Sequence, residues 1–207
     1  MPVLSEITNH KIVAIIRGAN PADVDKIVSA IYKGGVRLVE VTLNSTNALL
    51  LIKELNKKWG NDMLIGAGTV LTAQQAKEAI QAGARFIISP SVDIATISIT
   101  KEENIISIPG AYTATEIVTA HRAGADIIKI FPAGSRVDYF KDLQGPLSHI
   151  PMMPTGGITL NNIKDFQKAG AVAFGIGSAL VNTQDTIDDK YLAELTNRAK
   201  AFTEAVS

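Results

Sequence analysis

Short apolar runs and helical segments alternate eight times along the chain, and this alternation constrains the fold more than any other feature. The runs are rich in β-branched residues and are bounded by glycine or proline, which is typical of buried parallel strands. They cover residues 11–17, 36–43, 63–65, 85–89, 105–108, 126–132, 152–154 and 172–176. Eight strand–helix units favour closure into a barrel. We therefore predict an α/β fold, a single (β/α)8 TIM barrel over residues 1–207 with a lead-in helix at residues 3–10.

Several predicted helices have recognisable first and last residues. Four of them end at a glycine that leads directly into the next strand: Gly35, Gly83, Gly124 and Gly170. Glycine adopts a positive φ at low cost, so it suits the C-terminus of a helix. At the other end, Ser45 can cap the helix that runs to Trp59, and Thr113 has Glu116 at the spacing of a capping box.

The composition restricts the possible partners. The chain has 207 residues, a net charge of zero, 46% hydrophobic residues and no cysteine. This charge balance favours neither nucleic acid nor an anionic membrane surface as a partner. Without cysteine there is no disulfide framework or thiolate metal site, and we expect a cytoplasmic protein. The N-terminal residues do not resemble a signal peptide, and the apolar runs are shorter than the roughly 20 residues of a membrane span.

Lys129 stands in the middle of the sixth apolar run. Lysine is rarely buried without a partner or a function. Burial disfavours its charged form, and a lysine whose pKa fell from about 10.4 to about 7 would be roughly half neutral at pH 7. A neutral amine can attack a carbonyl group and form a Schiff base. The alternative is a lysine that extends past the strand end to water or is held in an ion pair.

Active sites of such barrels lie at the carboxyl ends of the strands, and only Arg17, Glu40 and Lys129 can carry charge there. Glu40 lies on the second predicted strand and Lys129 on the sixth. Because barrel layers take side chains from alternate strands, these two side chains can share a layer and converge. Glu40 would then be either the ionic partner of Lys129 or a general acid/base.

Glycine clusters follow the last two predicted strands, as Gly156-Gly157 and Gly177-Ser178. Loops at these two places often bind phosphate in this fold, through backbone N–H groups. The alternative is that the glycines only make tight turns. Thr69, which follows another glycine pair, can help to hold a smaller anion such as a carboxylate. The three histidines are scattered and no pair has metal-ligand spacing, so we expect neither a metal nor a cofactor.

Taken together, these strand ends resemble a known family. Over essentially its whole length the chain is similar to the 2-keto-3-deoxy-6-phosphogluconate (KDPG) and 4-hydroxy-2-oxoglutarate aldolases. The resemblance lies in the order and spacing of several segments, namely residues 12–17, 35–43, 66–71, 88–90, 108–110, 128–132, 154–158 and 175–179. Family members are commonly trimers, so the resemblance also implies a homotrimer.

The resemblance implies a class I aldolase that cleaves a 2-keto-3-deoxy sugar-acid phosphate to pyruvate and glyceraldehyde 3-phosphate. Lys129 would form the Schiff base and Glu40 would be the general acid/base. The other implied roles are substrate contacts: Arg17 and Thr69 near the pyruvate carboxylate, Pro90 and Phe131 shaping the pocket, Thr155 at a substrate hydroxyl, and Gly156, Gly157, Gly177 and Ser178 at the phosphate.

Two residues favour different epimers of the substrate. Asn44 stands where many family members carry arginine, and the Leu-Asn-Ser run resembles aldolases of the galactonate branch. Thr155 resembles the gluconate branch, which we predict here, with 4-hydroxy-2-oxoglutarate as a further substrate. The residues alone also leave open a phosphosugar epimerase or synthase on the same barrel, and a non-catalytic sugar-phosphate binding protein.

Overall fold

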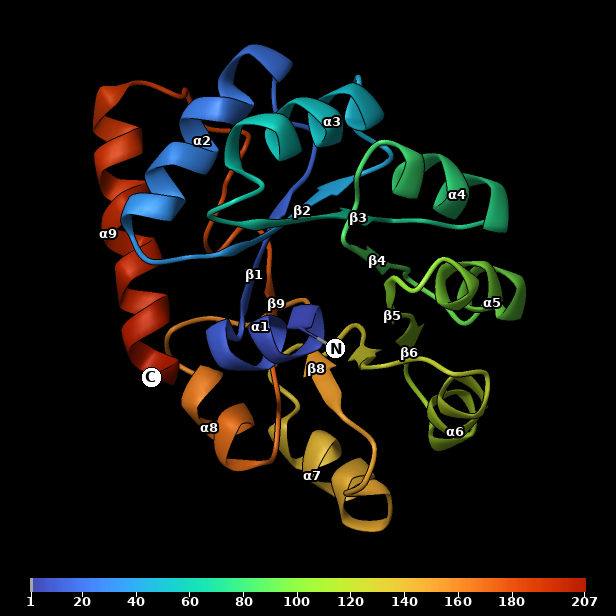
Figure 1. Cartoon of the computed structure of the whole chain (residues 1–207). Helices are drawn as coiled ribbons and strands as arrows, with labels where there is room; N and C mark the ends of the chain where they lie inside the picture. Colours follow the sequence, from blue (N-terminus) through green and yellow to red (C-terminus); the bar gives the residue numbers. More distant parts are fainter. Residues whose placement is uncertain (1) are drawn as a thin grey trace.

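The computed structural model describes residues 2–207. Its helices, in chain order, are α1 (Pro2–His10), α2 (Pro21–Lys33), α3 (Ala48–Trp59), α4 (Ala73–Gln81), α5 (Ile94–Glu102), α6 (Ala114–Arg122), α7 (Val137–Leu147), α8 (Ile163–Lys168) and α9 (Asp189–Val206). Its strands are β1 (Ile12–Ile16), β2 (Leu38–Thr42), β3 (Leu64–Gly68), β4 (Phe86–Ile88), β5 (Ile106–Ile108), β6 (Gly110–Ala111), β7 (Ile128–Ile130), β8 (Met152–Pro154) and β9 (Phe174–Ile176). Helices α2 to α9 surround the strands (Figure 1).

The strands form an α/β fold with a curled parallel sheet. Six strands pair in the order β5-β4-β3-β2-β1-β9, and three more pair as β6-β7-β8. The predicted strand at residues 105–108 corresponds to β5 and ends before Pro109, which has no N–H to donate to a ladder. The two-residue strand β6, which follows Pro109, was not predicted. The Pro109 carbonyl still accepts a hydrogen bond from the Lys129 N–H at 2.9 Å. At the other junction Thr155 and Gly175 form a parallel bridge.

The two faces of the sheet bury different clusters of side chains. Val39, Val41, Ile128 and Ile130 belong to the large cluster between the sheet and the helices. Leu38 and Ile127 belong to a second cluster, which also contains Ile7 of α1. Successive residues of a strand point to opposite faces. The face that carries Leu38 therefore also carries Glu40, and the face that carries Ile127 also carries Lys129.

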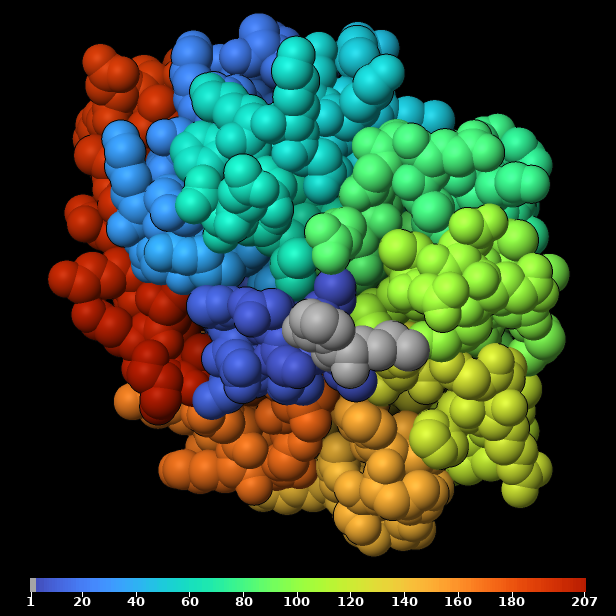
Figure 2. Space-filling view, in the orientation of Figure 1, coloured from blue at the N-terminus to red at the C-terminus, as the bar shows by residue number. Residues whose placement is uncertain are grey.

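Helix α1 covers one end of this second cluster. Its Ile7 is fully buried and belongs to the same cluster as residues of β1, β2, β4 and β5. Figure 2 views the molecule from this side, and α1 fills the centre between the surrounding helices. Burial of Ile7 stabilises α1 against the strands that follow it.

The predicted helix boundaries are confirmed in most places. Gly35, Gly83, Gly124 and Gly170 have φ values of +95°, +102°, +97° and +97°. Thr113 and Glu116 form the capping box reciprocally. The predicted cap at Ser45 is wrong, because α3 begins at Ala48 after Asn47, and Ser45 instead accepts a hydrogen bond from the Gly18 N–H at 2.9 Å. Among residues 2–207, no helix is long and apolar enough to span a membrane.

Candidate active site

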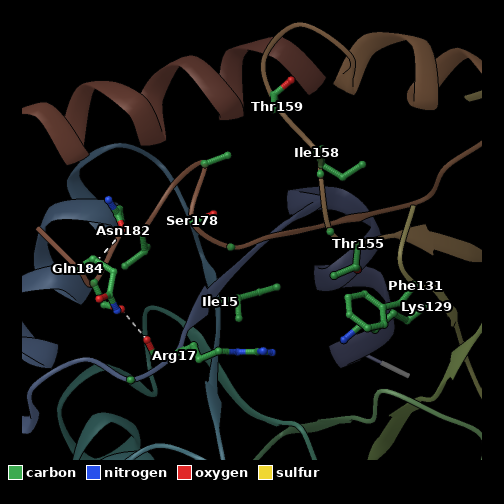
Figure 3. Close-up of a pocket in the computed structure, with 17 residues that line it drawn as sticks. Ile15, Arg17, Lys129, Phe131, Thr155, Ile158, Thr159, Ser178, Asn182 and Gln184 are labelled. Atoms are coloured by element: carbon green, nitrogen blue, oxygen red, sulfur yellow. Dashed lines mark hydrogen bonds between the residues drawn. The ribbon is translucent and has the colours of Figure 1, made fainter. Parts of the chain in front are cut away.

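The carboxyl ends of β1, β7, β8 and β9 and the loops after them surround a cavity of about 760 Å³. Its walls include Arg17 and Gly18 from β1, Lys129 and Phe131 from β7, and the loops after β8 and β9. In Figure 3, Arg17 extends across the cavity toward Lys129, Phe131 and Thr155. Lys129 and Arg17 are the two charged side chains of this wall, so the cavity offers positive charge to an anionic ligand.

Lys129 is buried, with 4% of its surface exposed. Burial lowers the pKa of its ammonium, the positive charge of Arg17 lowers it further, and the carboxylate of Glu40 opposes both effects. Its Nζ atom lies 4.8 Å from the centre of the Phe131 ring. The predicted burial is therefore confirmed, and among the described residues no carboxylate forms an ion pair with Lys129. The same low-dielectric setting that disfavours the ammonium favours the nucleophilic amine.

Glu40 lies on β2 with 1% of its surface exposed. Burial raises the pKa of its carboxyl group, while the charges of Lys129 and Arg17 pull the pKa down. Neither carboxylate oxygen accepts a hydrogen bond from the described residues. A Cβ atom at Gly68 would come within 2.6 Å of Glu40 Oε1, so glycine at this position of β3 makes room for the carboxylate. Both carboxylate oxygens are therefore buried and keep unused hydrogen-bonding positions.

Arg17 and Thr69 approach one another from different strands. An Nη2 atom of Arg17 lies 3.5 Å from Thr69 Oγ1. Thr69 follows β3 directly and has a φ of +56°. A left-handed conformation is uncommon for threonine and occurs often at functional sites. The structure thus brings together the two residues that the sequence associated with a carboxylate.

The glycine clusters lie on one side of the cavity. Gly156 and Gly157, with φ values of +81° and +77°, follow β8, and Gly177 and Ser178 follow β9. Thr155 precedes the first pair and is 2% exposed, and its hydroxyl has no hydrogen-bond partner among the described residues. A buried polar atom without a partner costs free energy, so the Thr155 hydroxyl is suited to a bound ligand.

Three of the predicted site residues, Glu40, Thr69 and Pro90, are not part of the cavity wall itself. Glu40 lies deeper, on β2, and Pro90 follows β4, where its carbonyl would be 2.4 Å from a Cβ atom at Gly110. The absence of a side chain at Gly110 therefore lets the loop after β4 pack closely on β6. Phe131 does line the cavity, beside Lys129.

The sequence predicted Gly177 and Ser178 in the loop after β9 but did not identify the residues further along this loop. Asn182, Thr183 and Gln184 line the cavity from this loop (Figure 3). The position of these residues after a strand could have identified them, because loops after barrel strands carry substrate contacts. Among residues 2–207, no group of three histidine, aspartate or glutamate side chains is placed to hold a metal ion.

The site combines a buried lysine whose pKa is lowered with a buried carboxylate, at the carboxyl ends of parallel strands. Such a lysine can form an imine with a carbonyl substrate. The family is identified by comparison. The family model "KDPG and KHG aldolase" matches residues 3–197. The chain belongs to this family, and it is a class I aldolase, a carbon–carbon lyase.

Relatives of both epimer branches are similar to the chain. The 2-dehydro-3-deoxy-6-phosphogalactonate aldolase of Escherichia coli K12 is 32% identical over 96% of this chain and 98% of its own. The 2-dehydro-3-deoxy-phosphogluconate aldolase of Treponema pallidum is 32% identical over 88% of this chain and 87% of its own. Among solved structures, KDPG aldolase of Legionella pneumophila with a pyruvate carbinolamine has a TM-score of 0.85 and 26% identity, and the match covers 96% of each chain.

Proposed function

We propose that the chain cleaves KDPG to pyruvate and glyceraldehyde 3-phosphate through a Schiff base on Lys129. The observation that carries this proposal is the burial of Lys129 at the cavity wall, which lowers the pKa of its ammonium. The Legionella relative was captured with pyruvate as a covalent carbinolamine. A carbinolamine is the adduct that an amine and a ketone form before they lose water to give an imine.

The reaction begins when the neutral amine of Lys129 attacks the C2 ketone. Loss of water from the carbinolamine gives a protonated imine. Glu40 accepts the proton of the C4 hydroxyl through a water molecule, the C3–C4 bond breaks, and its electron pair moves into the iminium to form an enamine. Glyceraldehyde 3-phosphate leaves, Glu40 returns a proton to C3, and hydrolysis of the resulting imine releases pyruvate. The raised pKa of Glu40 suits a group that both accepts and donates a proton.

The carboxylate of the substrate binds Arg17 and Thr69 in this proposal. Their side chains meet at 3.5 Å, and a guanidinium group forms strong hydrogen bonds with a carboxylate. The phosphate binds at Gly156, Gly157, Gly177 and Ser178, on the side of the cavity formed by the loops after β8 and β9. The C4 hydroxyl then lies near Thr155. A substrate that lacks phosphate, 4-hydroxy-2-oxoglutarate, presents a second carboxylate to the same loops.

A second candidate substrate is 2-keto-3-deoxy-6-phosphogalactonate. Asn44 favours it, because the Leu-Asn-Ser run resembles aldolases of the galactonate branch, and the Escherichia coli relative is named for this epimer. Asn44 is exposed and does not line the cavity. Thr155 is buried at the cavity wall with an unpaired hydroxyl. We give Thr155 more weight and propose the gluconate epimer as the preferred substrate.

The complete scaffold in this proposal is one domain over residues 1–207, a (β/α)8 barrel. Its closure is supported by contacts at both junctions between the two sheets. The chain continues from β5 to β6 through Pro109, and Thr155 bridges Gly175 between β8 and β9. The Val172 N–H also donates a hydrogen bond to the Met152 carbonyl at 3.0 Å.

We further propose a homotrimer in the cytoplasm. Leu49, Leu50 and Leu71 are 36%, 53% and 51% exposed, although large apolar side chains are usually buried. Leu49 and Leu50 border a shallow surface pocket that also includes Leu43. An interface between copies would bury this surface.

A cytoplasmic setting is consistent with the substrate, because a phosphorylated sugar acid is charged and does not cross a lipid bilayer unaided.

Reduction with borohydride in the presence of pyruvate tests the proposed chemistry. We expect mass spectrometry to find one pyruvate adduct on Lys129, and we expect Lys129→Ala to lose both the adduct and cleavage. Lys101 is an internal control, because Asp126 holds its Nζ atom at 2.6 Å. An adduct on Lys101 or another lysine, or none at all, would contradict the proposal.

A further inference from the structure

The peptide group that follows Arg17 is held at both of its ends by side-chain hydroxyl groups. Thr183 Oγ1 donates a hydrogen bond to the Arg17 carbonyl at 2.7 Å. The N–H of the same peptide group, which belongs to Gly18, donates to Ser45 Oγ at 2.9 Å. The Arg17 carbonyl and the Gly18 N–H share one plane, so these two bonds fix the orientation of that plane.

The two hydroxyl groups come from the two neighbours of β1 in the sheet. Strand β1 lies between β2 and β9. Ser45 belongs to the loop after β2, and Thr183 belongs to the loop after β9. Gly18 has a φ of +63°, and nothing lies within 4 Å of the place where its Cβ would be. The turn at this position therefore needs glycine for its backbone conformation, and the two neighbouring loops hold it there.

Each hydroxyl is anchored to the rest of the fold. The Ser45 hydroxyl lies 3.0 Å from Thr42 Oγ1 on β2, which ties the turn to the strand that carries Glu40. In the other loop, the Tyr191 hydroxyl of α9 donates to the Asn182 carbonyl at 3.0 Å. The Gln184 N–H donates to Asn182 Oδ1 at 3.3 Å, and this bond closes the turn that presents Thr183 (Figure 3).

The orientation of this peptide group matters because it adjoins the Cα atom that carries the Arg17 side chain. Arg17 is exposed, and its long side chain extends across the cavity toward Lys129 (Figure 3). Its only described side-chain hydrogen bond within residues 2–207 is the long one to Thr69. Such a side chain loses considerable rotamer freedom when it binds a ligand. A backbone that already points the side chain across the cavity reduces that loss.

We propose that Thr183 and Ser45 are positioning residues, whose hydroxyl groups hold the Arg17–Gly18 peptide and thereby direct the guanidinium group at the carboxylate of the bound 2-keto acid. This inference rests on the proposed function, because it assigns the carboxylate to Arg17. In this inference Thr183 acts through Arg17 and not on the reacting carbons. Its effect falls on the binding of pyruvate and of the intact substrate, since both contain this carboxylate.

A matched pair of variants tests the inference. Thr183→Val removes the hydroxyl and keeps the shape, whereas Thr183→Ser keeps the hydroxyl. For Thr183→Val we expect about a three- to tenfold rise in KM and in the pyruvate concentration that gives half-maximal borohydride inactivation, which is the effect of losing one neutral hydrogen bond. The kcat should stay within about twofold. Thr183→Ser should remain close to the wild type, and Ser45→Ala should reproduce the effect of Thr183→Val.

A double-mutant cycle with Arg17→Gln separates positioning from general stabilisation. If Thr183 acts through the guanidinium group, Thr183→Val has no further effect on half-inactivation once Arg17 is glutamine. An equal rise in both backgrounds would overturn the inference, as would equal behaviour of Thr183→Val and the wild type. Absence of trapping in the wild type would instead overturn the proposed function, so the two failures are distinguishable.

Discussion

Glu40 opposes the effect of burial on Lys129. Burial and the charge of Arg17 both lower the pKa of the Lys129 ammonium, and the Glu40 carboxylate raises it. The relationship is reciprocal, because the ammonium lowers the pKa of Glu40 against the effect of burial. No hydrogen bond joins Glu40 to Lys129 within the described residues. The two groups therefore tune one another through space, and both keep free positions for a ligand.

This coupling predicts how the reactivity of Lys129 depends on pH. The neutral fraction of Lys129 rises with pH and reaches one half at its pKa, which burial places below the ordinary value of about 10.4. In Glu40→Gln the ammonium loses its neighbouring anion, so we expect this midpoint to move to a still lower pH. Acetic anhydride labelling of Lys129, read by mass spectrometry against a lysine peptide in the same sample, measures the midpoint.

An opposite shift is expected when a neighbouring cation is removed. Arg17→Gln takes away a positive charge that lowers the pKa of Lys129, so the midpoint should move to higher pH. Shifts of Glu40→Gln and Arg17→Gln in the same direction would show that the variants act through a change of burial and not through charge.

Glu40→Gln also separates formation of the imine from cleavage of the carbon–carbon bond. Glutamine occupies the same space beside Gly68 but cannot accept the proton of the C4 hydroxyl. We expect kcat for cleavage to fall by about 10²- to 10⁴-fold, the usual contribution of a general acid/base. The variant should still be trapped on Lys129 by pyruvate and borohydride. Normal cleavage by Glu40→Gln would assign the proton transfer to another group.

The phosphate subsite is better tested at Gly177 than at Gly157. A Cβ at Gly157 would lie 2.7 Å from the Gly134 Cα atom, and φ there is +77°, so a side chain would strain the backbone. A Cβ at Gly177 would meet nothing within 4 Å, and Gly177 lines the cavity. We therefore expect Gly177→Ala to fold normally and to occupy space that the phosphate needs.

The expected result for Gly177→Ala is a selective rise in KM. For the phosphorylated substrate we expect about a tenfold increase or more, because hydrogen bonds to a charged group are lost. For 4-hydroxy-2-oxoglutarate the change should be smaller. Steady-state kinetics on the two substrates measure the ratio, and thermal unfolding checks the fold. Equal effects on both substrates would show that this loop does not distinguish phosphate.

Thr155 predicts which epimer the enzyme prefers. Its buried hydroxyl has no partner among the described residues, so it can bond the C4 hydroxyl of one epimer and is left unpaired with the other. We expect a higher kcat/KM for the gluconate epimer, and we expect Thr155→Val to narrow the difference by about three- to tenfold. Kinetics on both epimers decide the matter. A wild-type preference for the galactonate epimer would show that Asn44 marks the specificity and Thr155 does not.

Local patterns predicted those features that depend on neighbours in sequence. The glycines at the helix ends have the expected positive φ. This conformation depends only on the backbone of the glycine itself, so the local sequence is enough to predict it. Alternation along β2 and β7 predicted which face of the sheet carries Glu40 and Lys129, and Leu38 and Ile127, two positions before each, belong to the second cluster on that face. The cap assigned to Ser45 was wrong, since its competing partner, the Gly18 N–H, lies 27 residues away.

The sequence by itself determined the alternation of strands and helices and the face of the sheet on which Glu40 and Lys129 lie. It also determined the family to which the chain belongs. Only the tertiary structure decided how deeply the two side chains are buried, that a second short strand follows Pro109, and that Thr183 and Ser45 hold the peptide after Arg17. The physical reason is distance along the chain. Backbone periodicity is set over a few residues, whereas burial and a hydrogen bond across 166 residues of sequence exist only after the elements have packed.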